Sequence, residues 1–180
     1  MSRRINSKKK GAKNERDISK LLEKWTNKKF ARTPSSGGLN WHARSSISGD
    51  IVCTTEGHYF PFSIEVKFHK EINFEHLLYI DNPEVMKFWA QAFSDAKKAG
   101  KIPLLFMRYN GLPKDFHFVA MDSPIFVKLV VENWGIIPFT NFLKVKHPKG
   151  NITIIKSVDL FKLSYKSLRK SAKQWLKKQK

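Results

Sequence analysis

The stretch that decides the fold of this chain is Asp50-Ile-Val-Cys-Thr-Thr-Glu-Gly-His-Tyr-Phe-Pro-Phe-Ser-Ile-Glu-Val-Lys-Phe68. Asp50–Cys53 has the apolar character of a buried strand, Thr55–His58 is a turn, and Tyr59–Phe68 is a second strand. Apolar and polar residues alternate near the end of the second strand, so its apolar side chains face one side and its charged side chains the other. The stretch therefore predicts two strands that carry both core and polar residues.

Acidic residues of this stretch are expected to meet at one point. Glu65 and Lys67 lie on the same face of the second strand. If the two strands pair through their turn, Asp50 lies beside them, and Glu15 on the first helix completes the group. Carboxylates that face one point repel one another unless a divalent cation lies between them. Hard oxygen ligands suit Mg²⁺, with Mn²⁺ as a substitute, and a nearby lysine can orient or help to deprotonate an attacking water.

Outward from this stretch, the first 120 residues read as α-β-β-β-α-β-β, a small mixed α/β domain. The second helix is the best marked, because Asp81 or Asn82 can cap it, Pro83 suits its first turn and Gly100 ends it. The other expected elements are a helix over 11–25 and strands over 28–33, 102–109 and 116–120.

The last third of the chain is read as an extension of that domain. Its expected elements are a short helix over 125–134, a strand over 151–158 and a final helix over 159–178. From residue 161 onward it carries eight bases and no acid. We therefore expect a flexible basic arm over 1–10, a core domain over 11–120, and a basic extension over 121–180 that packs on the core.

The charge of the chain points to a polyanionic partner. It has 34 Lys and Arg against 15 Asp and Glu, a net charge of +19. Basic residues that neutralise phosphates release counterions and bind without sequence preference, so nucleic acid is the leading partner and an anionic membrane surface the second. The single cysteine, Cys53, and the absence of a long apolar run or signal-peptide pattern predict a soluble, cytoplasmic protein. Its compact size suits a microbial protein or a viral protein inside its host cell.

The loop over 34–49 contains no acid and is longer than most structural loops. Trp41, beside Arg44, either stacks on an unpaired base or packs against the protein surface. Gln91 on the second helix either points toward the metal site or is an exposed polar residue. No Gly-rich phosphate loop, zinc spacing or serine-hydrolase elbow is present, so the carboxylates remain the candidates for chemistry.

Asp50, followed by Glu65-Val66-Lys67, resembles the PD-(D/E)xK nuclease signature, with Gly49 at the motif's nominal proline. The order of expected elements is similar to that superfamily's restriction-endonuclease-like core, α-β-β-β-α-β with a central mixed sheet flanked by helices. The closer resemblance is to archaeal-type Holliday junction resolvases. The segments over 8–110 that carry it are, in chain order, Lys10-Gly11, Glu15-Arg16, Arg32-Thr-Pro34-Ser-Ser36-Gly37, Asp50-Ile51, Glu65-Val66-Lys67 and Ala99-Gly100-Lys-Ile-Pro103.

This resemblance implies a homodimeric, Mg²⁺-dependent endonuclease that acts on branched double-stranded DNA. Its implied active site consists of Glu15, Asp50, Glu65 and Lys67, with the three carboxylates as metal ligands. By the same resemblance Arg16 and Arg32 contact backbone phosphate, and a loop serine, Ser35 or Ser36, approaches the scissile phosphate. Lys8, Lys9 and Lys10 of the basic arm are expected to hold the DNA backbone, and Trp41 and Arg44 of the loop to contact the nucleic acid, with Trp41 stacked on an unpaired base.

Other interpretations remain open at this point. A Glu-x-Lys pair in a strand is often a solvated charge pair, and Glu15 at a helix start often serves only the helix dipole. A sequence-specific nicking, restriction-like or homing endonuclease has the same core as a resolvase. A non-catalytic basic protein that binds nucleic acid accounts for the charge without any catalysis. RNA is not excluded as the substrate.

Overall fold

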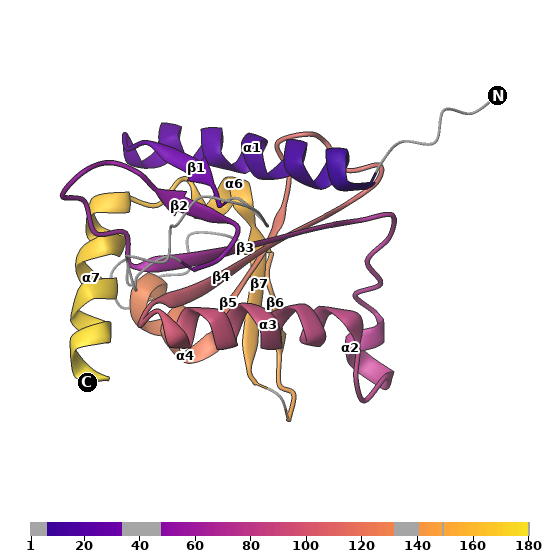
Figure 1. Cartoon of the computed structure of the whole chain (residues 1–180). Coiled ribbons are helices and arrows are strands. Elements are labelled where there is room, and N and C mark those ends of the chain that lie inside the picture. Colours follow the sequence, from indigo (N-terminus) through magenta and orange to yellow (C-terminus); the bar gives the residue numbers. More distant parts are fainter. Residues whose placement is uncertain (1–6, 34–47, 132–140, 149, 180) are drawn as a thin grey trace.

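A seven-stranded sheet with the order β1-β2-β3-β4-β5-β7-β6 runs through the molecule and is covered by helices on both faces (Figure 1). The computed structural model describes residues 7–33, 48–131, 141–148 and 150–179. All neighbouring strands pair antiparallel except β3 and β4, which are parallel. The sheet is therefore mixed, and the expected restriction-endonuclease-like α/β fold is confirmed.

The helices and strands of the described residues have the following bounds, each kind in chain order. The helices are α1 (Ser7–Thr26), α2 (His76–Tyr79), α3 (Glu84–Lys98), α4 (Ser123–Phe126), η2 (Val127–Val131), α6 (Ser157–Leu160) and α7 (Tyr165–Lys178). The strands are β1 (Phe30–Arg32), β2 (Ile51–Cys53), β3 (Phe62–His69), β4 (Ile102–Tyr109), β5 (Phe118–Asp122), β6 (Leu143–Val145) and β7 (Ile152–Lys156).

The centre of the sheet is the parallel pair β3 and β4, which are joined through α3. Their register places Ile64 opposite Leu104 and Glu65 opposite Leu105. Because side chains alternate along a strand, Ile64 and Leu104 face one layer, whereas Glu65 and Leu105 face the layer that contains α3. Parallel strands need a crossover of this kind, and both of their faces must be covered by other elements.

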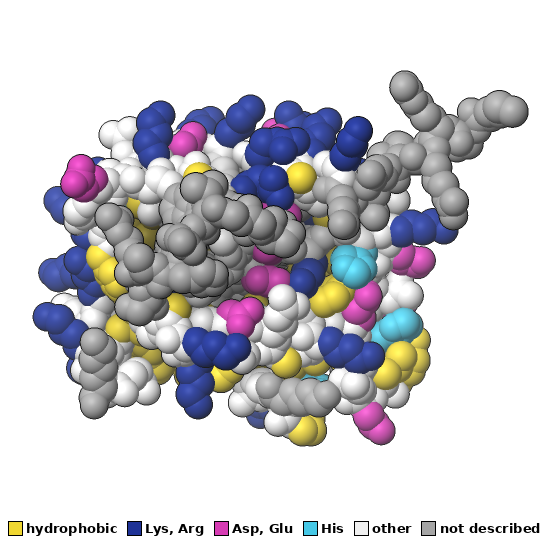
Figure 2. Space-filling model, viewed as in Figure 1, with side chains coloured by type: hydrophobic (Ala, Val, Ile, Leu, Met, Phe, Trp, Pro, Cys, Tyr) yellow, Lys and Arg dark blue, Asp and Glu magenta, His cyan; other side chains and the backbone are white. Residues whose placement is uncertain are grey.

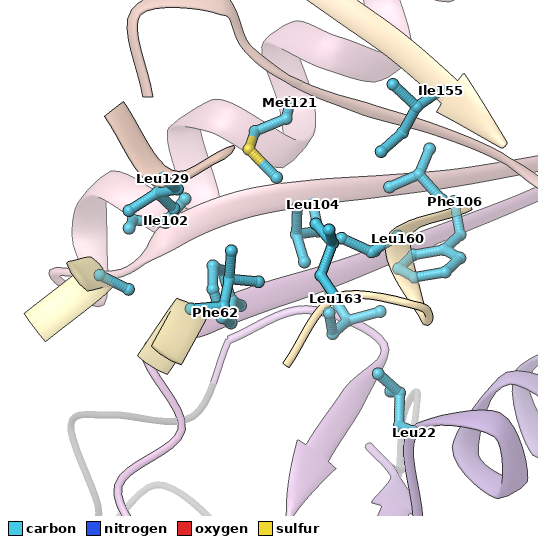
Figure 3. Close-up of a cluster of buried hydrophobic side chains, with 14 of the residues drawn as sticks. Leu22, Phe62, Ile102, Leu104, Phe106, Met121, Leu129, Ile155, Leu160 and Leu163 are labelled. Carbon is cyan, nitrogen blue, oxygen red and sulfur yellow. The ribbon is translucent and has the colours of Figure 1, made fainter. Parts of the chain in front are cut away.

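One hydrophobic core fills the face covered by α1, α6 and α7. Its side chains include Leu22 from α1, Phe106 from β4, Leu160 from the end of α6, and Leu163 from the connection between α6 and α7 (Figure 3). Leu22, Phe106 and Leu160 are fully buried, so α1 and the C-terminal segment are held against the same sheet face. The second core, on the other face, centres on Trp89 of α3, which is 1% exposed.

The N-terminal helix starts earlier than the sequence suggests. The first ten residues were expected to form a flexible arm, but α1 begins at Ser7, so residues 7–10 are helical. Ile18 and Leu22 are buried one turn apart and fix the helix on the sheet. The helix ends at Asn27, whose φ of 54° is the left-handed conformation that asparagine tolerates at a helix C-terminus.

Several other boundaries differ from the sequence-based expectation. The strand expected over 59–68 begins only at Phe62, because Pro61 has no N–H to donate to a ladder. The strand expected over 116–120 is displaced to Phe118–Asp122, where β5 pairs along its whole length with β7. The N-cap of α3 is Pro83 rather than Asp81 or Asn82.

The C-terminal third joins the sheet instead of only packing on it. β7 pairs with β5, and the unexpected three-residue β6 pairs with β7. The single helix expected over 159–178 is divided into α6 and α7, because the Ser164 side chain accepts a hydrogen bond from the Ser167 N–H and caps a new helix. The helix expected over 125–134 is described only as far as residue 131, as α4 followed by η2. No helix among the described residues is long and apolar enough to cross a membrane.

His117 makes the stability of this fold sensitive to acid. Its ring is fully buried, and Nε2 donates to Oδ1 of Asn14 at 2.9 Å. Burial, and then the Arg108 guanidinium, lower the pKa of His117 from 6.5 to about 4. Because the unfolded chain takes up a proton first, the contribution of His117 to the free energy of unfolding should fall by about 3 kcal/mol as the pH decreases from 6.5 to 4. Asp50, whose pKa is raised to about 6, acts in the opposite direction in the same window, so the effect of His117 is measured as a difference between wild type and a His117 variant.

Chemical denaturation at several pH values measures this loss of stability. His117→Gln removes the titrating ring, so its free energy of unfolding should rise relative to that of wild type as the pH decreases through that window. His69→Gln, a change at a partly exposed ring, should keep the wild-type dependence. An equal slope for wild type and His117→Gln would contradict the assignment.

Candidate active site

Asp50 is fixed between β1 and β3 by its backbone and its side chain. Its N–H donates to the Ile64 carbonyl oxygen at 2.7 Å, and its own carbonyl accepts from the Thr33 N–H at 2.8 Å. The carboxylate oxygen Oδ2 accepts the N–H of Val66 at 2.8 Å. These three bonds hold the Asp50 carboxylate beside β3, as the sequence predicts.

Gly49 allows this close approach to β3. Its φ is 81°, and a Cβ at this position would lie 2.2 Å from the carbonyl oxygen of Ile64. The Gly49 carbonyl accepts from the Thr33 hydroxyl at 2.8 Å, so the segment is held from both sides. A residue with a side chain therefore fits neither the backbone conformation nor the space.

Glu65 and Lys67 lie side by side on the face of β3 that α3 covers. Glu65 is only 4% exposed, and its Oε1 lies 2.7 Å from Lys67 Nζ. Lys67 Nζ also donates to Oε1 of Gln91 on α3 at 2.9 Å and lies 5.7 Å from the centre of the Phe88 ring. The lysine is thus held by two acceptors from different elements. Gln91 is an exposed polar residue, and its side chain nevertheless reaches Lys67 of the candidate site.

Glu15 approaches the group from α1 but is paired with a base. Its Oε2 accepts a hydrogen bond from Nε of Arg32, the last residue of β1. Both side chains are partly buried. Arg32, expected to contact phosphate, is therefore also the ion-pair partner of a candidate metal ligand, a contact that the sequence pattern does not reveal.

The electrostatics of Asp50 show that the carboxylates act on one another. Burial, then the negative charge of Glu65 and more weakly that of Glu15, raise the pKa of Asp50 from 3.8 to about 6, although the Val66 N–H and Lys67 act to lower it. Like charges at short range disfavour the charged form in this way. A cation placed among these oxygens would remove that repulsion.

The donor set fits a hard divalent cation. Among the described residues, no three His, Cys, Asp or Glu side chains already form a metal-ligand group. The available donors are nevertheless carboxylate oxygens, which Mg²⁺ prefers. Their negative charges repel one another, and a bound cation would relieve this repulsion. Asp50 and Glu65 are the residues that would hold the ion, with Glu15 as a third donor once its contact with Arg32 opens.

The candidate nucleic-acid contacts are only partly within the described residues. Arg16 and Lys9 are exposed on α1. Lys10 is partly buried, donates to Oδ1 of Asn110 at 3.4 Å and lies over the Phe68 ring. The side chains of Ser35, Ser36, Trp41, Arg44 and Lys8 lie outside the described residues, so their assignments stay predictions.

Figure 2 shows how charge is distributed on one face of the molecule. Magenta Asp and Glu side chains lie near its middle and also at several points of its margins, and dark-blue Lys and Arg side chains lie mainly along its upper and left margins, with others beside and below the middle. The basic side chains over α1 lie at the upper margin, and those over α7 lie at the left margin. A polyanion that reaches the acidic centre would therefore meet basic side chains around it.

Two features of the site are absent from the sequence-based picture. Ser48 donates its hydroxyl to Ser63 on β3 at 2.7 Å, next to the Gly49 contact. The only signal in the sequence is that Ser63 shares its face with Glu65 and Lys67. The close contact of Gly49 with the Ile64 backbone depends on how two segments pack, and the sequence does not indicate which backbone a glycine contacts.

Comparison with known proteins gives one family and one relative. The family model described as "Phage putative PDDEXK endonuclease" matches residues 6–174. Protein D14 of Escherichia phage T5 is 24% identical over 121 residues, which cover 66% of this chain and 72% of that protein. No solved structure matches the chain.

Proposed function

Since the chain belongs to the family of phage PDDEXK endonucleases, we propose that it is a Mg²⁺-dependent DNA endonuclease that resolves Holliday junctions or similar branched DNA. The observation that carries the proposal is the arrangement of Asp50, directly before β2, with Glu65 and Lys67 on β3, where Lys67 is held by both Glu65 and Gln91. Two carboxylates and a lysine in this arrangement match the chemistry that phosphodiester hydrolysis requires.

Each residue has a distinct task in the proposed reaction. Bound Mg²⁺ supplies a Lewis acid that polarises the phosphodiester. Asp50 and Glu65 provide the oxygens that would bind the ion, and Lys67 orients the attacking water for in-line displacement. Arg32, already beside Glu15, can turn toward a phosphate when that ion pair opens. Arg16, exposed on the same helix as Glu15, contacts the neighbouring backbone.

We propose branched DNA rather than linear DNA as the substrate, because residues 8–110 resemble archaeal-type junction resolvases. A junction must be cut in two strands at symmetric positions, so the proposal includes a homodimer with two active sites. A nicking, restriction-like or homing endonuclease is the second candidate, since the same catalytic group serves any DNA backbone.

The test compares cleavage of a four-way junction with cleavage of its component duplexes, each with and without Mg²⁺. The proposal expects junction cleavage that depends on the metal and little cleavage of the duplexes. Equal rates on linear DNA would refute the resolvase proposal in favour of the second candidate. Tight, salt-sensitive binding without cleavage of any DNA would indicate a non-catalytic binding protein.

Gln91→Ala should lower the cleavage rate by about tenfold, because a hydrogen bond to a charged group contributes roughly 1.5 kcal/mol and Lys67 keeps its contact with Glu65. Single-turnover rates at saturating enzyme should show the loss, and DNA affinity should not change.

The matched control is Ser94→Ala, an exposed position further along α3. Gln91→Glu keeps an acceptor for Lys67, so it should recover most of the rate. Unchanged single-turnover rates in Gln91→Ala would show that the lysine needs no such support.

A further inference from the structure

A row of lysines follows the outer face of α7. Lys166, Lys170, Lys173 and Lys177 recur at helical spacing on the side opposite the buried Leu168. We call these four residues the lysine row. Figure 2 shows dark-blue side chains along the part of the surface where Figure 1 places α7.

The lysine row carries its charge without acidic partners. Helix α7 contains no acidic residue. None of the ion pairs formed within the described part of the chain involves a lysine of the row. Like charges one turn apart destabilise a helix, so this arrangement works against the stability of α7. Such a cost is offset when a polyanion binds along the row.

Further basic residues extend this surface toward the end of α1. Nε of Arg169 donates to the Tyr59 carbonyl at 3.0 Å, and Lys173 lies over the Tyr59 ring. Burial lowers the pKa of the neighbouring His58, and the positive charges of Arg169, Lys28 and Lys173 lower it further. Arg169, Lys28 and Lys173 therefore lie close enough to His58 to act on its charge, which places these three bases on the same part of the surface.

The helix is not free to lie on a membrane. Membrane-surface helices insert an apolar face into the lipid boundary. The apolar face of α7 is already used, because Leu168 and Ala172 are fully buried in the core. Tyr165 at its start packs edge-on against Trp25 of α1. The lysine row can therefore offer charge only, which suits a phosphate backbone.

We propose that the lysine row, with Arg169 and Lys28, binds the sugar-phosphate backbone of duplex DNA outside the catalytic site. This inference rests on the proposed function for the nature of the polyanion. Glu15 and Trp25 lie on the same helix, about 15 Å apart along its axis at 1.5 Å per residue. Because Trp25 contacts Tyr165 at the start of α7, the lysine row begins near the end of α1, and about four or five base pairs of duplex span the separation of Glu15 and Trp25 along α1.

The experiment measures duplex DNA binding over a range of salt concentrations in EDTA, where no cleavage takes place. The test variant is Lys166→Gln/Lys170→Gln/Lys177→Gln, which leaves the Lys173–Tyr59 contact intact. The matched control removes the same charge from β6 and β7, at the other edge of the sheet from β1, with Lys144→Gln/Lys146→Gln/Lys156→Gln. Thermal melting checks that both variants are folded.

The slope of log affinity against log salt should become shallower by about 3 in the test variant, since each phosphate contact contributes about 0.9. The control should change it by less than 1. Equal slopes for wild type and test variant would overturn the inference. Wild-type binding to phosphatidylserine vesicles that the test variant loses, with DNA binding unchanged, would overturn it in favour of a membrane surface.

These outcomes are distinct from those that concern the proposed function. If the chain cuts no DNA but the test variant shows the shallower slope, the catalytic proposal fails and the lysine row stands. If the chain cuts junctions and the slopes are equal, the catalytic proposal stands and the lysine row has no part in binding.

Discussion

Glu65→Gln is expected to lower DNA cleavage by at least about a thousandfold while DNA binding stays the same or improves. A metal that polarises the phosphodiester is worth several kcal/mol, and each 1.36 kcal/mol corresponds to a factor of ten in rate. Glutamine has the same shape as glutamate, so the buried position remains filled, and Lys67 keeps its bond to Gln91. The loss of one negative charge reduces repulsion of the phosphate backbone.

Cleavage of a labelled junction and its binding in EDTA measure the two effects separately. Glu56→Gln is the matched control, because it makes the same change at an exposed position on the connection between β2 and β3. That control should cut at the wild-type rate. Cleavage by Glu65→Gln at the wild-type rate would show that the site is wrongly assigned.

Gly49→Ala should damage both the fold and the site. A φ of 81° costs a residue with a side chain roughly 1–3 kcal/mol, and the Cβ contact with the Ile64 carbonyl forces the segment away from β3. Asp50, whose N–H is bonded to the same carbonyl, moves with it. Since a displacement of about 1 Å can cost a hundredfold in rate, cleavage should fall by at least that factor.

Gly57→Ala separates strain from contact. Gly57 has a φ of 66°, but a Cβ there would have no neighbour within 4 Å. The Gly57→Ala variant should lose stability only because alanine is strained in this backbone conformation, and chemical denaturation measures that loss. The variant should keep most of its cleavage activity. If both alanine variants lose stability and activity equally, the contact with Ile64 has no importance of its own.

The sequence predicts the centre of this site well because its residues lie close together in one hairpin-like stretch. The alternation around Glu65 and Lys67 determines which face they share, and a single pairing of two strands brings Asp50 beside them. Family membership confirms the PD-(D/E)xK expectation. The family match does not identify the chain as an archaeal-type junction resolvase. The branched substrate, the homodimer and the requirement for Mg²⁺ therefore stay proposals.

The local sequence pattern does not predict contacts between segments that are distant in the chain. The pairing of Arg32 with Glu15 joins β1 to α1, and nothing in either local sequence indicates it. The three-residue β6 is too short to show a period, and it exists because β7 offers it an edge. Helix α1 starts at Ser7 although residues 7–10 contain no apolar residue. In each case the partner in space, and not the local sequence, decides the structure.

The parallel pairing of β3 with β4 has a consequence for synthesis of the chain. Glu65 lies opposite Leu105, so the strand that carries Glu65 and Lys67 gains this neighbour only after the ribosome has made the intervening helix and β4. Contacts between residues so distant in sequence form late in folding. A nascent chain thus contains Asp50, Glu65 and Lys67 before it has the sheet that aligns them. The proposed catalytic group is therefore aligned only once β4, which ends at residue 109 of 180, has been made, and a shorter nascent chain should not cut nucleic acid.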